Sequence, residues 1–281
     1  MTRRRLATRL FAWHAEAGRT LLIRDASTPW EVLVAEVMSH QTGIGRVGPA
    51  WRRFVDTWPS PAALADAGTR DLLAAWSGLG YNRRALALRE TARRIVLDHG
   101  ERVPVSVIEL ETLPGIGPYT ARAVAATAFG TPVAPLDVNV RRVMSRVSGS
   151  DPGSRDLQET ADALVDRRDP RRWLNAVMDL ATSTCTKAAP RCGSCPLSRM
   201  CASRGDVSVA GMPRRSLPFP QTTRWLRGRL VASLTGASPG AWIPLPLRMG
   251  DHDAEAILAA ARSLEREGFL ELLDGCARVR P

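Results

Sequence analysis

Hydrophobic residues recur at helical spacing, three or four positions apart, along most of this chain. Alternation of single apolar and polar residues, which is typical of half-buried strands, is almost absent before Cys201. The pattern therefore predicts an all-α body. The helices that we expect cover residues 3–17, 29–42, 47–58, 61–67, 71–76, 82–99, 107–112, 157–167 and 169–183.

The second of these segments, Pro29 to Thr42, is apolar on nearly every face, so we expect a buried helix. Ser27 and Thr28 supply a capping hydroxyl, and the proline suits the first turn. Glu36 is the exception inside this helix, because burial of a carboxyl group raises its pKa. A raised pKa suits a general acid, although a buried glutamate with a local hydrogen bond explains the same pattern.

The last sixty residues have a different character. Two helical segments are followed by two short strand-like runs around a turn at Asp274–Gly275, a pair typical of hairpins. This order predicts a small winged-helix-like α+β module over residues 222–281. Residues 205–221 are rich in proline, serine and arginine and are expected to form a linker.

The chain has 281 residues and a net charge of +11, so a core of ordinary size is possible and a polyanionic partner is favoured. A basic protein without such a partner stays a possible alternative. No run of eighteen apolar residues is present, and no signal peptide is recognisable, so we expect no membrane span. We expect a monomer in the cytoplasm, at the nucleoid.

Four of the five cysteines crowd into one segment, with six, two and five intervening residues. Clustered cysteines indicate a metal site, whereas disulfide frameworks spread cysteines out. Four thiolates in one loop suit either zinc or an iron–sulfur cluster, and their spacing alone leaves both open. The four are Cys185, Cys192, Cys195 and Cys201; Cys276 stands alone and has no assigned role.

The segment from Leu113 to Arg142 reads LPGIGPYTARAVAATAFGTPVAPLDVNVRR and holds two chemical features. Gly115 and Gly117 permit a tight turn and close approach of another backbone, and amide groups at the helix start that follows suit a phosphate. Asp137 then stands at the start of another helix. We interpret the first feature as a grip on a DNA backbone and the second as a catalytic carboxylate.

A loop that reads SGLGYNRRA places Tyr81 between two glycines and an arginine pair. An aromatic ring on such a loop can stack on a base or wedge between bases. A tyrosine that packs against its own turn is an equally good explanation of these residues.

Five motifs resemble the helix-hairpin-helix–GPD superfamily of DNA glycosylases, and in particular its MutY-type adenine DNA glycosylases, over about residues 3–204. The motifs are AEVMSHQT at 35–42, WSGLGYNRRA at 76–85, LPGIGPYTARAVA at 113–125, LDVNVRRV at 136–143 and MDLATSTC at 178–185. The resemblance implies a glycosylase domain over residues 1–204. In it, residues 26–135 would form a six-helix lobe with the hairpin at 113–121, and residues 1–25 with 136–204 the cluster-containing lobe.

The same resemblance implies a [4Fe–4S] cluster on the loop 185–201 and double-stranded DNA with a mispaired or damaged base as the partner. Glu36 would protonate the departing base, and Asp137 would stabilise the sugar cation. Lys187 and Arg191 would face phosphates on the cysteine loop. Bifunctional relatives carry a lysine where this chain has Tyr119, which we place with the catalytic residues, so we expect a monofunctional enzyme.

The expected base pocket departs from the family pattern. Leu22–Ile23–Arg24 stands where adenine-specific members carry P-W-R, and Met38–Ser39–His40–Gln41–Thr42 stands where they carry M-L-Q-Q-T. The pocket that we expect is formed by Arg24, Ser39, His40, Gln41, Thr42 and Tyr81. Two enzymatic hypotheses follow: removal of adenine opposite 8-oxoguanine or guanine, which we favour, and removal of a pyrimidine opposite guanine. A DNA-binding homologue without activity is the third.

Overall fold

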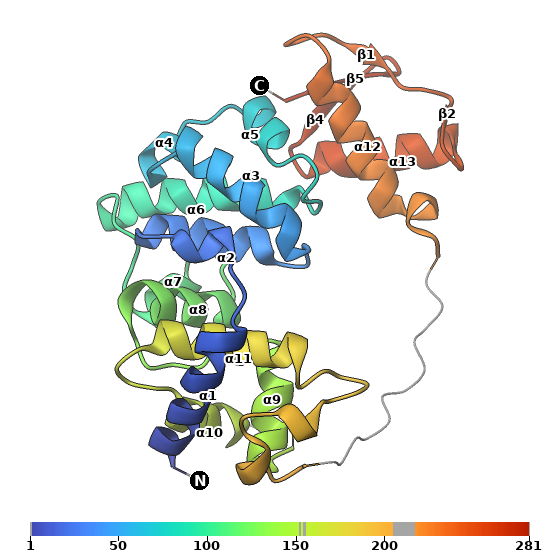
Figure 1. Cartoon of the computed structure of the whole chain (residues 1–281). Coiled ribbons are helices and arrows are strands. Elements are labelled where there is room, and N and C mark those ends of the chain that lie inside the picture. The colour runs from blue at the N-terminus through green and yellow to red at the C-terminus, as the bar shows by residue number, and fades with distance from the viewer. Residues whose placement is uncertain (1, 152, 154–155, 205–216, 281) are drawn as a thin grey trace. The chain divides into compact units, whose positions relative to one another are not determined.

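The computed structural model describes residues 2–151, 153, 156–204 and 217–280. Thirteen α-helices carry most of this described part of the chain, which confirms the expected helical body (Figure 1). Before the linker region the helices are α1 Arg3–Ala17, α2 Pro29–Ser39, α3 Ile44–Thr57, α4 Pro61–Ala65, α5 Thr69–Ala75, α6 Arg83–His99, α7 Val107–Glu111, α8 Pro118–Phe129, α9 Val138–Ser148, α10 Asp156–Leu164 and α11 Pro170–Ser183.

The chain folds into two compact units, each made of two separate segments. The first combines Met1–Glu36 with Val103–Met212, and the second combines Val37–Arg102 with Pro213–Pro281. The lobe and domain boundaries expected from the sequence stay predictions.

The core of the first unit lies where α11 packs against α1, α8 and α9. Trp173 and Leu180 of α11 are buried there with Leu6 and Leu10 of α1 and Val143 of α9. These residues recur at helical spacing in the sequence, so the apolar stripe of each helix became its packing face.

The start of α2 is a capping box. The Glu31 amide donates to Thr28 Oγ1 at 3.2 Å, and the Ser27 amide donates to Glu31 Oε2 at 2.6 Å. The helix ends at Ser39, three residues before the end that the sequence predicted, and Gln41 adopts a positive φ of 52°.

Arg84 ends α2 from outside the helix. Its Nη1 donates to the carbonyl oxygens of Val37, Met38 and His40 at 2.9, 3.0 and 2.6 Å. These are among the last carbonyl groups of the helix, which have no intrahelical partner. Because a side chain from α6 satisfies them, the chain turns away after Ser39 instead of continuing.

In the second unit, α4 packs on α6, and three aromatic residues lie near the centre of the helical part. The ring centroids of Phe54 and Trp58 are 4.7 Å apart, and those of Phe54 and Trp76 are 5.8 Å apart in an edge-to-face arrangement. Such pairs contribute beyond their buried area and hold α3 and α5 together.

The C-terminal part of the second unit is the helix, helix and hairpin that the sequence predicted. It consists of α12 Thr223–Gly236, β1 Ile243–Pro244, β2 Arg248–Met249, β3 His252–Asp253, α13 Ala254–Arg266, β4 Leu270–Leu273 and β5 Cys276–Val279. Strands β1, β5 and β4 form an antiparallel sheet, and β2 pairs with β3. Asp274 and Gly275 both have positive φ, as a tight hairpin requires.

This module packs α12 against α13, and α12 also contacts α5 of the helical part. Arg70 donates to the carbonyl oxygen of Leu234 across that contact at 3.4 Å. The expected linker, residues 205–221, falls mostly outside the described residues, apart from a short 3-10 turn at Phe219–Gln221. None of the described helices is long and apolar enough to span a bilayer.

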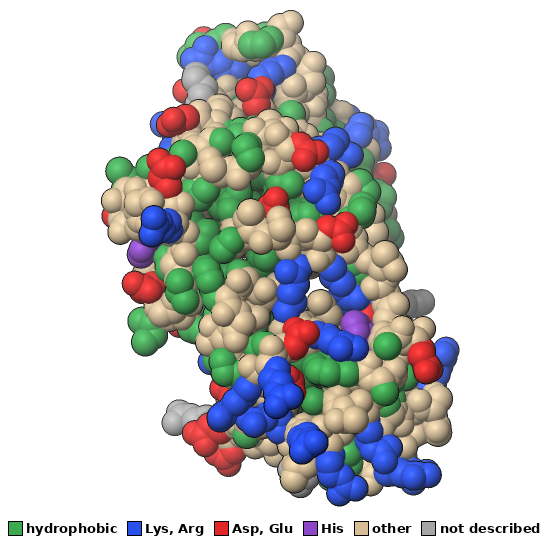
Figure 2. All heavy atoms as spheres, turned by 60° about the vertical axis from the view of Figure 1, so that its left-hand side comes forward, with side chains coloured by type: hydrophobic (Ala, Val, Ile, Leu, Met, Phe, Trp, Pro, Cys, Tyr) green, Lys and Arg blue, Asp and Glu red, His purple; other side chains and the backbone are tan. Residues whose placement is uncertain are grey.

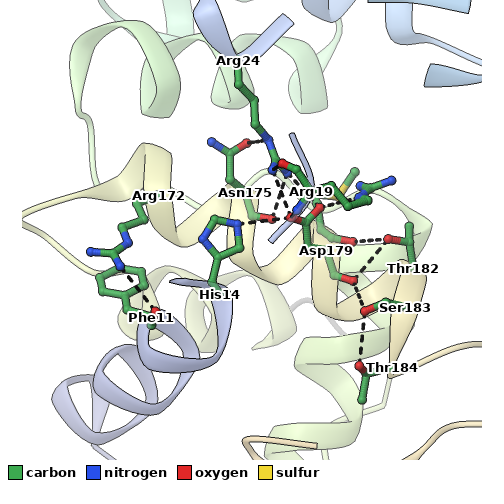
Figure 3. A network of polar contacts seen from close by, with 11 residues as sticks. Phe11, His14, Arg19, Arg24, Arg172, Asn175, Asp179, Thr182, Ser183 and Thr184 are labelled. Carbon is green, nitrogen blue, oxygen red and sulfur yellow. Dashed lines mark hydrogen bonds and ion pairs between the residues drawn. The ribbon is translucent and has the colours of Figure 1, made fainter. Parts of the chain in front are cut away.

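A buried carboxylate on α11 connects this helix to α1 and to the turn at Leu22–Asp25 (Figure 3). Asp179 of α11 is fully buried and accepts hydrogen bonds from Arg24 Nη2 at 2.8 Å, Arg19 Nε at 2.7 Å and His14 Nε2 at 3.2 Å. Burial by itself would raise the pKa of Asp179, but the hydrogen bonds from Arg24 and Arg19 outweigh it and hold that pKa below its ordinary value. The network fixes α1 and the turn at Leu22–Asp25 on α11.

We expect Asp179→Asn to lower the free energy of unfolding by about 3 kcal/mol at pH 7, because buried guanidinium groups lose their counter-charge. The folded-state pKa of Asp179 is depressed, so its contribution is present above the unfolded pKa and is lost as the pH falls through the folded pKa. Urea denaturation at pH 7 and in acid measures both effects. Asp98→Asn, which breaks an exposed pair with Arg94 within α6, is the control. Equal losses in the two variants would contradict the prediction.

Candidate active site

Glu36 lies on α2 among the buried side chains of Leu33, Val37 and the rest of that helix, and it keeps a small accessible fraction. Burial, and after it the negative charge of Asp137, raise the pKa of Glu36 to about 7. Two carboxyl groups that are far apart in the sequence are therefore close enough to influence each other.

Asp137 is the N-cap of α9. Its Oδ1 accepts from the amides of Asn139 and Val140 at 2.8 and 2.7 Å, and its Oδ2 accepts from Asn139 Nδ2 at 2.8 Å. These donors and the positive end of the helix dipole complement a negative charge. The carboxylate is thus anchored at one position before any ligand binds.

Tyr119 completes this group from the first turn of α8. Burial raises the pKa of Tyr119 well above its ordinary value, and the charges of Glu36 and then Asp137 add to that effect. The phenol therefore stays protonated at neutral pH. The structure brings together the three residues that the sequence analysis placed in the catalytic group, within one compact unit.

Two further residues extend the site toward the cysteine loop. Asn139 Oδ1 accepts from Arg142 Nη1 at 3.1 Å, and Arg142 Nε donates to the carbonyl oxygen of Cys185 at 2.9 Å. Arg142 Nη2 donates to the carbonyl oxygen of Ala181 at 2.8 Å. A continuous path of hydrogen bonds runs from Asp137 to the first cysteine. Our sequence analysis missed both residues, although their spacing of three places them on one helix face.

The four clustered cysteines line one cavity, together with Val143, Leu180 and Arg146. All four are free thiols. Arg146 Nη1 donates to the Cys185 sulfur at 3.5 Å, so a positive charge lies where a thiolate would need one. Among the described residues, no group of three histidine, cysteine or acidic side chains is arranged to hold a single metal ion.

Of the two glycines of the hairpin turn, only Gly115 has the positive φ that glycine permits. Gly115 has a φ of +76°, and Gly117 is the extended N-cap of α8, followed by Pro118. Both glycines are exposed, and so are Lys187 and Arg191 of the cysteine loop. All four groups are accessible to a DNA backbone, and their contact with phosphate stays a prediction.

Arginines also collect on the first unit away from these residues. Figure 2 shows Lys and Arg side chains gathered over the lower end of the face in view. Arg5 and Arg9 of α1 line a surface cavity with Arg199 of the cysteine loop. This distribution is that of a surface for a polyanion.

The residues expected in the base pocket divide into two groups. Arg24 is held by Asp179 and by Asn175 Oδ1, which accepts from its Nε at 3.1 Å. The second group lies at the end of α2 and consists of Ser39, His40, Gln41 and Thr42. Thr42 connects this end to the glycine loop, because its Oγ1 donates to the carbonyl oxygen of Leu79 at 2.9 Å. Their contact with a base stays a prediction.

His40 is the titratable group at this end of α2. Burial lowers the pKa of His40, and the positive charge of Arg84 lowers it further. The imidazole is therefore neutral at pH 7. Arg84 also donates to Thr42 Oγ1 at 2.9 Å and to the carbonyl oxygen of Gly80 at 2.8 Å, so one guanidinium organises both the helix end and the loop that carries Tyr81. We had noted Arg84 only as one of an arginine pair.

Comparison with known proteins gives a consistent assignment. Residues 34–168 match the model of the HhH-GPD superfamily base excision DNA repair proteins. The chain is 41% identical to an adenine DNA glycosylase of Mycobacterium tuberculosis over 82% of this chain and 78% of the relative. It is 35% identical to a thymine/uracil-DNA glycosylase of Pyrobaculum aerophilum over 67% of this chain and 86% of that protein.

The solved structure of a thermostable thymine-DNA glycosylase superposes with a TM-score of 0.68 and 26% identity, over 72% of this chain and 96% of that one. The fold, the motifs and the sequence identity thus agree. The chain belongs to the HhH-GPD superfamily of base excision DNA repair proteins and is a base-excision DNA glycosylase.

Proposed function

We propose that this protein is a monofunctional DNA glycosylase that removes adenine opposite 8-oxoguanine or guanine. The observation that carries the proposal is the pairing in one site of Glu36, whose pKa is raised to about 7, with Asp137, which is anchored as the N-cap of α9. The similarity to an adenine DNA glycosylase over most of the chain supports adenine as the base.

Glu36 acts first in the proposed reaction. The mispaired nucleotide leaves the stack, since its glycosidic bond is out of reach inside a duplex. With a pKa of about 7, Glu36 is protonated in about half of the molecules at neutral pH and can donate that proton to a ring nitrogen of the base. The base then leaves as a neutral molecule, and such proton transfer contributes about 10²–10⁴-fold to the rate.

Asp137 acts as the glycosidic bond breaks. Its negative charge faces the positive charge that develops on the sugar, and its hydrogen bonds to Asn139 and Val140 fix it in place beforehand. Water adds to the sugar carbon and gives its proton to the Glu36 carboxylate formed in the first step, which leaves an abasic site and restores the acid. Two carboxyl groups in different environments take opposite roles, as in glycoside hydrolysis.

The lack of strand cleavage follows from the distribution of amines. The single lysine of the sequence is Lys187, which is exposed on the cysteine loop. Tyr119 occupies the position of the lysine that forms a Schiff base in bifunctional relatives. A neutral phenol beside Glu36 cannot form that adduct, so the product is the intact abasic strand.

The cysteine loop fits a [4Fe–4S] cluster. Four thiols from one loop line one cavity, and Arg146 offers positive charge to Cys185. One zinc ion needs its sulfurs at about 2.3 Å from a common centre, whereas a cubane spreads its four thiolates over separate irons. The spacing of the four cysteines, which resembles that of the iron–sulfur members of the family, favours the cluster. When bound, it would supply structural cross-links for the loop.

A pyrimidine paired with guanine is the second candidate substrate. Ser39 and His40 stand where adenine-specific members carry apolar and amide side chains, and polar groups in a pocket change which base it holds. The similarity to a thymine/uracil-DNA glycosylase supports this alternative. In either case we propose a monomer that acts on damaged or mispaired DNA in the cytoplasm, at the nucleoid.

A panel of duplexes that each carry one mispair, followed by alkaline cleavage of abasic sites, tests the proposal. Adenine release opposite 8-oxoguanine or guanine is the expected result. Release of only a pyrimidine opposite guanine would establish the alternative, and binding without release would refute both. Borohydride added during the reaction should trap no protein–DNA adduct, because the position of the Schiff-base lysine is held by Tyr119 and the single lysine, Lys187, lies on the cysteine loop.

We expect Glu36→Gln to slow single-turnover excision about 10²–10⁴-fold while duplex binding is retained, because the proton donor is lost. The wild-type rate should fall as the pH rises above about 7, since Glu36 must be protonated and its pKa lies there. Asp137→Asn should lower the pKa of Glu36, measured by NMR of the labelled carboxyl carbon. Glu90→Gln on the surface of α6 is the control. A wild-type rate that stays constant from about pH 6 to about pH 9 would contradict the assignment of Glu36 as the proton donor.

We expect the purified protein to contain iron and inorganic sulfide in equal amounts, with visible charge-transfer absorption. Cys192→Ala should lower both together, because it removes one ligand of the cluster. Cys276→Ala is the matched control, since Cys276 lies on β5 away from the cysteine loop in the sequence, and it should leave both contents unchanged. Zinc as the sole metal would contradict the cluster.

A further inference from the structure

The C-terminal module contacts the loop that carries Tyr81. Arg224, in the first turn of α12, donates from Nη1 to the phenolic oxygen of Tyr81 at 2.5 Å. Its guanidinium also lies 4.8 Å from the centroid of the tyrosine ring. Both residues belong to the second compact unit. The catalytic group described above does not use this contact.

Aromatic rings and guanidinium groups alternate around it. Arg224 lies 5.0 Å from the ring centroid of Phe219, and Arg84 lies 5.7 Å from that of Tyr81. The two rings remain accessible, at 38% for Tyr81 and 52% for Phe219. We call Phe219, Arg224, Tyr81 and Arg84 the aromatic–arginine ladder.

The ladder carries uncompensated positive charge. Within the described part of the chain, neither Arg84 nor Arg224 forms an ion pair, and the hydrogen bonds of Arg84 all end on carbonyl or hydroxyl oxygens. The nearby carboxylate of Glu267 is already paired with Arg227 at 2.8 Å and with Arg83 at 3.5 Å. Accessible rings beside unpaired guanidinium groups are the usual composition of a surface that stacks bases and holds phosphates.

The loop presents Tyr81 from a fixed backbone. Tyr81 has a φ of +50°, which non-glycine residues seldom adopt, and Gly80 before it has a φ of +71°. Trp76 Nε1 and Arg84 Nη2 both donate to the carbonyl oxygen of Gly80, at 3.2 and 2.8 Å. A strained conformation that neighbouring groups hold in place is typical of functional loops.

We propose that Phe219, just before the C-terminal module, and Arg224 of that module form, with Tyr81, one surface that binds the DNA duplex. The rings stack on exposed bases, and Arg224 holds the Tyr81 ring in position and pairs with a phosphate. This inference rests on the proposed function, because it takes a mispaired duplex as the substrate. It gives residues 222–281 a part in binding the mispaired duplex, with Arg224 as a residue that both contacts the DNA and positions Tyr81.

The first test compares Arg224→Ala with Arg229→Ala in the full-length protein. Both residues are exposed on α12, and Arg229 lies over Trp225, outside the ladder. Arg224→Ala should weaken binding to an adenine–8-oxoguanine duplex about tenfold, as expected for a lost stacking contact. The slope of log affinity against log salt should become shallower by about one, because one phosphate contact is lost. Arg229→Ala should bind within about twofold of wild type.

A second pair of variants separates stacking from charge. Phe219→Ala should weaken binding about tenfold with the wild-type salt slope, because a ring and no charge is removed. Arg224→Lys should keep the salt slope but lose part of the preference for the mispair over a matched duplex, since an ammonium group cannot stack on the Tyr81 ring as a planar guanidinium does. Thermal melting of each variant checks that the module remains folded.

Three results would overturn the inference: Arg224→Ala indistinguishable from Arg229→Ala, tighter binding by Arg224→Ala, or Phe219→Ala with wild-type affinity. The proposed function fails separately, if the wild-type protein releases no adenine. In that case a loss of duplex affinity in Arg224→Ala and Phe219→Ala still supports the ladder. Adenine release by the wild type with unaffected binding in both variants would refute the ladder alone.

Discussion

The carboxyl group of Glu36 lies where the protein disfavours its charge, and the rest of the candidate active site depends on this constraint. An apolar helix removes water from the group, and the nearby negative charge of Asp137 opposes its ionisation, so its pKa rises to about 7. A carboxylic acid of that strength can give up a proton near neutral pH. Tyr119 is held neutral by the same burial and the same charges, which keeps the site free of a competing nucleophile.

Local structure anchors the carboxyl group of Asp137 in that site. Its carboxylate accepts hydrogen bonds from an amide of its own helix and from the Asn139 side chain. Asn139 and Arg142 then continue the path of hydrogen bonds to the backbone of Cys185. The position of the catalytic carboxylate is thereby linked to the position of the cysteine loop. This gives the loop a structural role in the site, because any shift of its first cysteine reaches Asp137 through two side chains.

Arginine side chains serve two different purposes in this chain. In the first unit, Arg24 and Arg19 neutralise the buried Asp179 and hold elements together. In the second, Arg84 binds only neutral oxygens and Arg224 only a phenol, so their charges remain available to a polyanion. The same residue type thus serves folding in one place and, in our proposal, recognition of DNA in the other.

The sequence by itself determined the features that obey local rules. They are the capping box before α2, the Asp137 cap of α9, the positive φ of Gly115 and the Asp274–Gly275 hairpin. Each depends on neighbours within four residues, so the local sequence is enough to predict it. Only the tertiary structure decided that α2 ends at Ser39 under Arg84, that Arg24 is held by Asp179, and that Arg224 meets Tyr81. Long guanidinium side chains reach partners far away in the chain, and no local spacing encodes which oxygen or ring such a group will find.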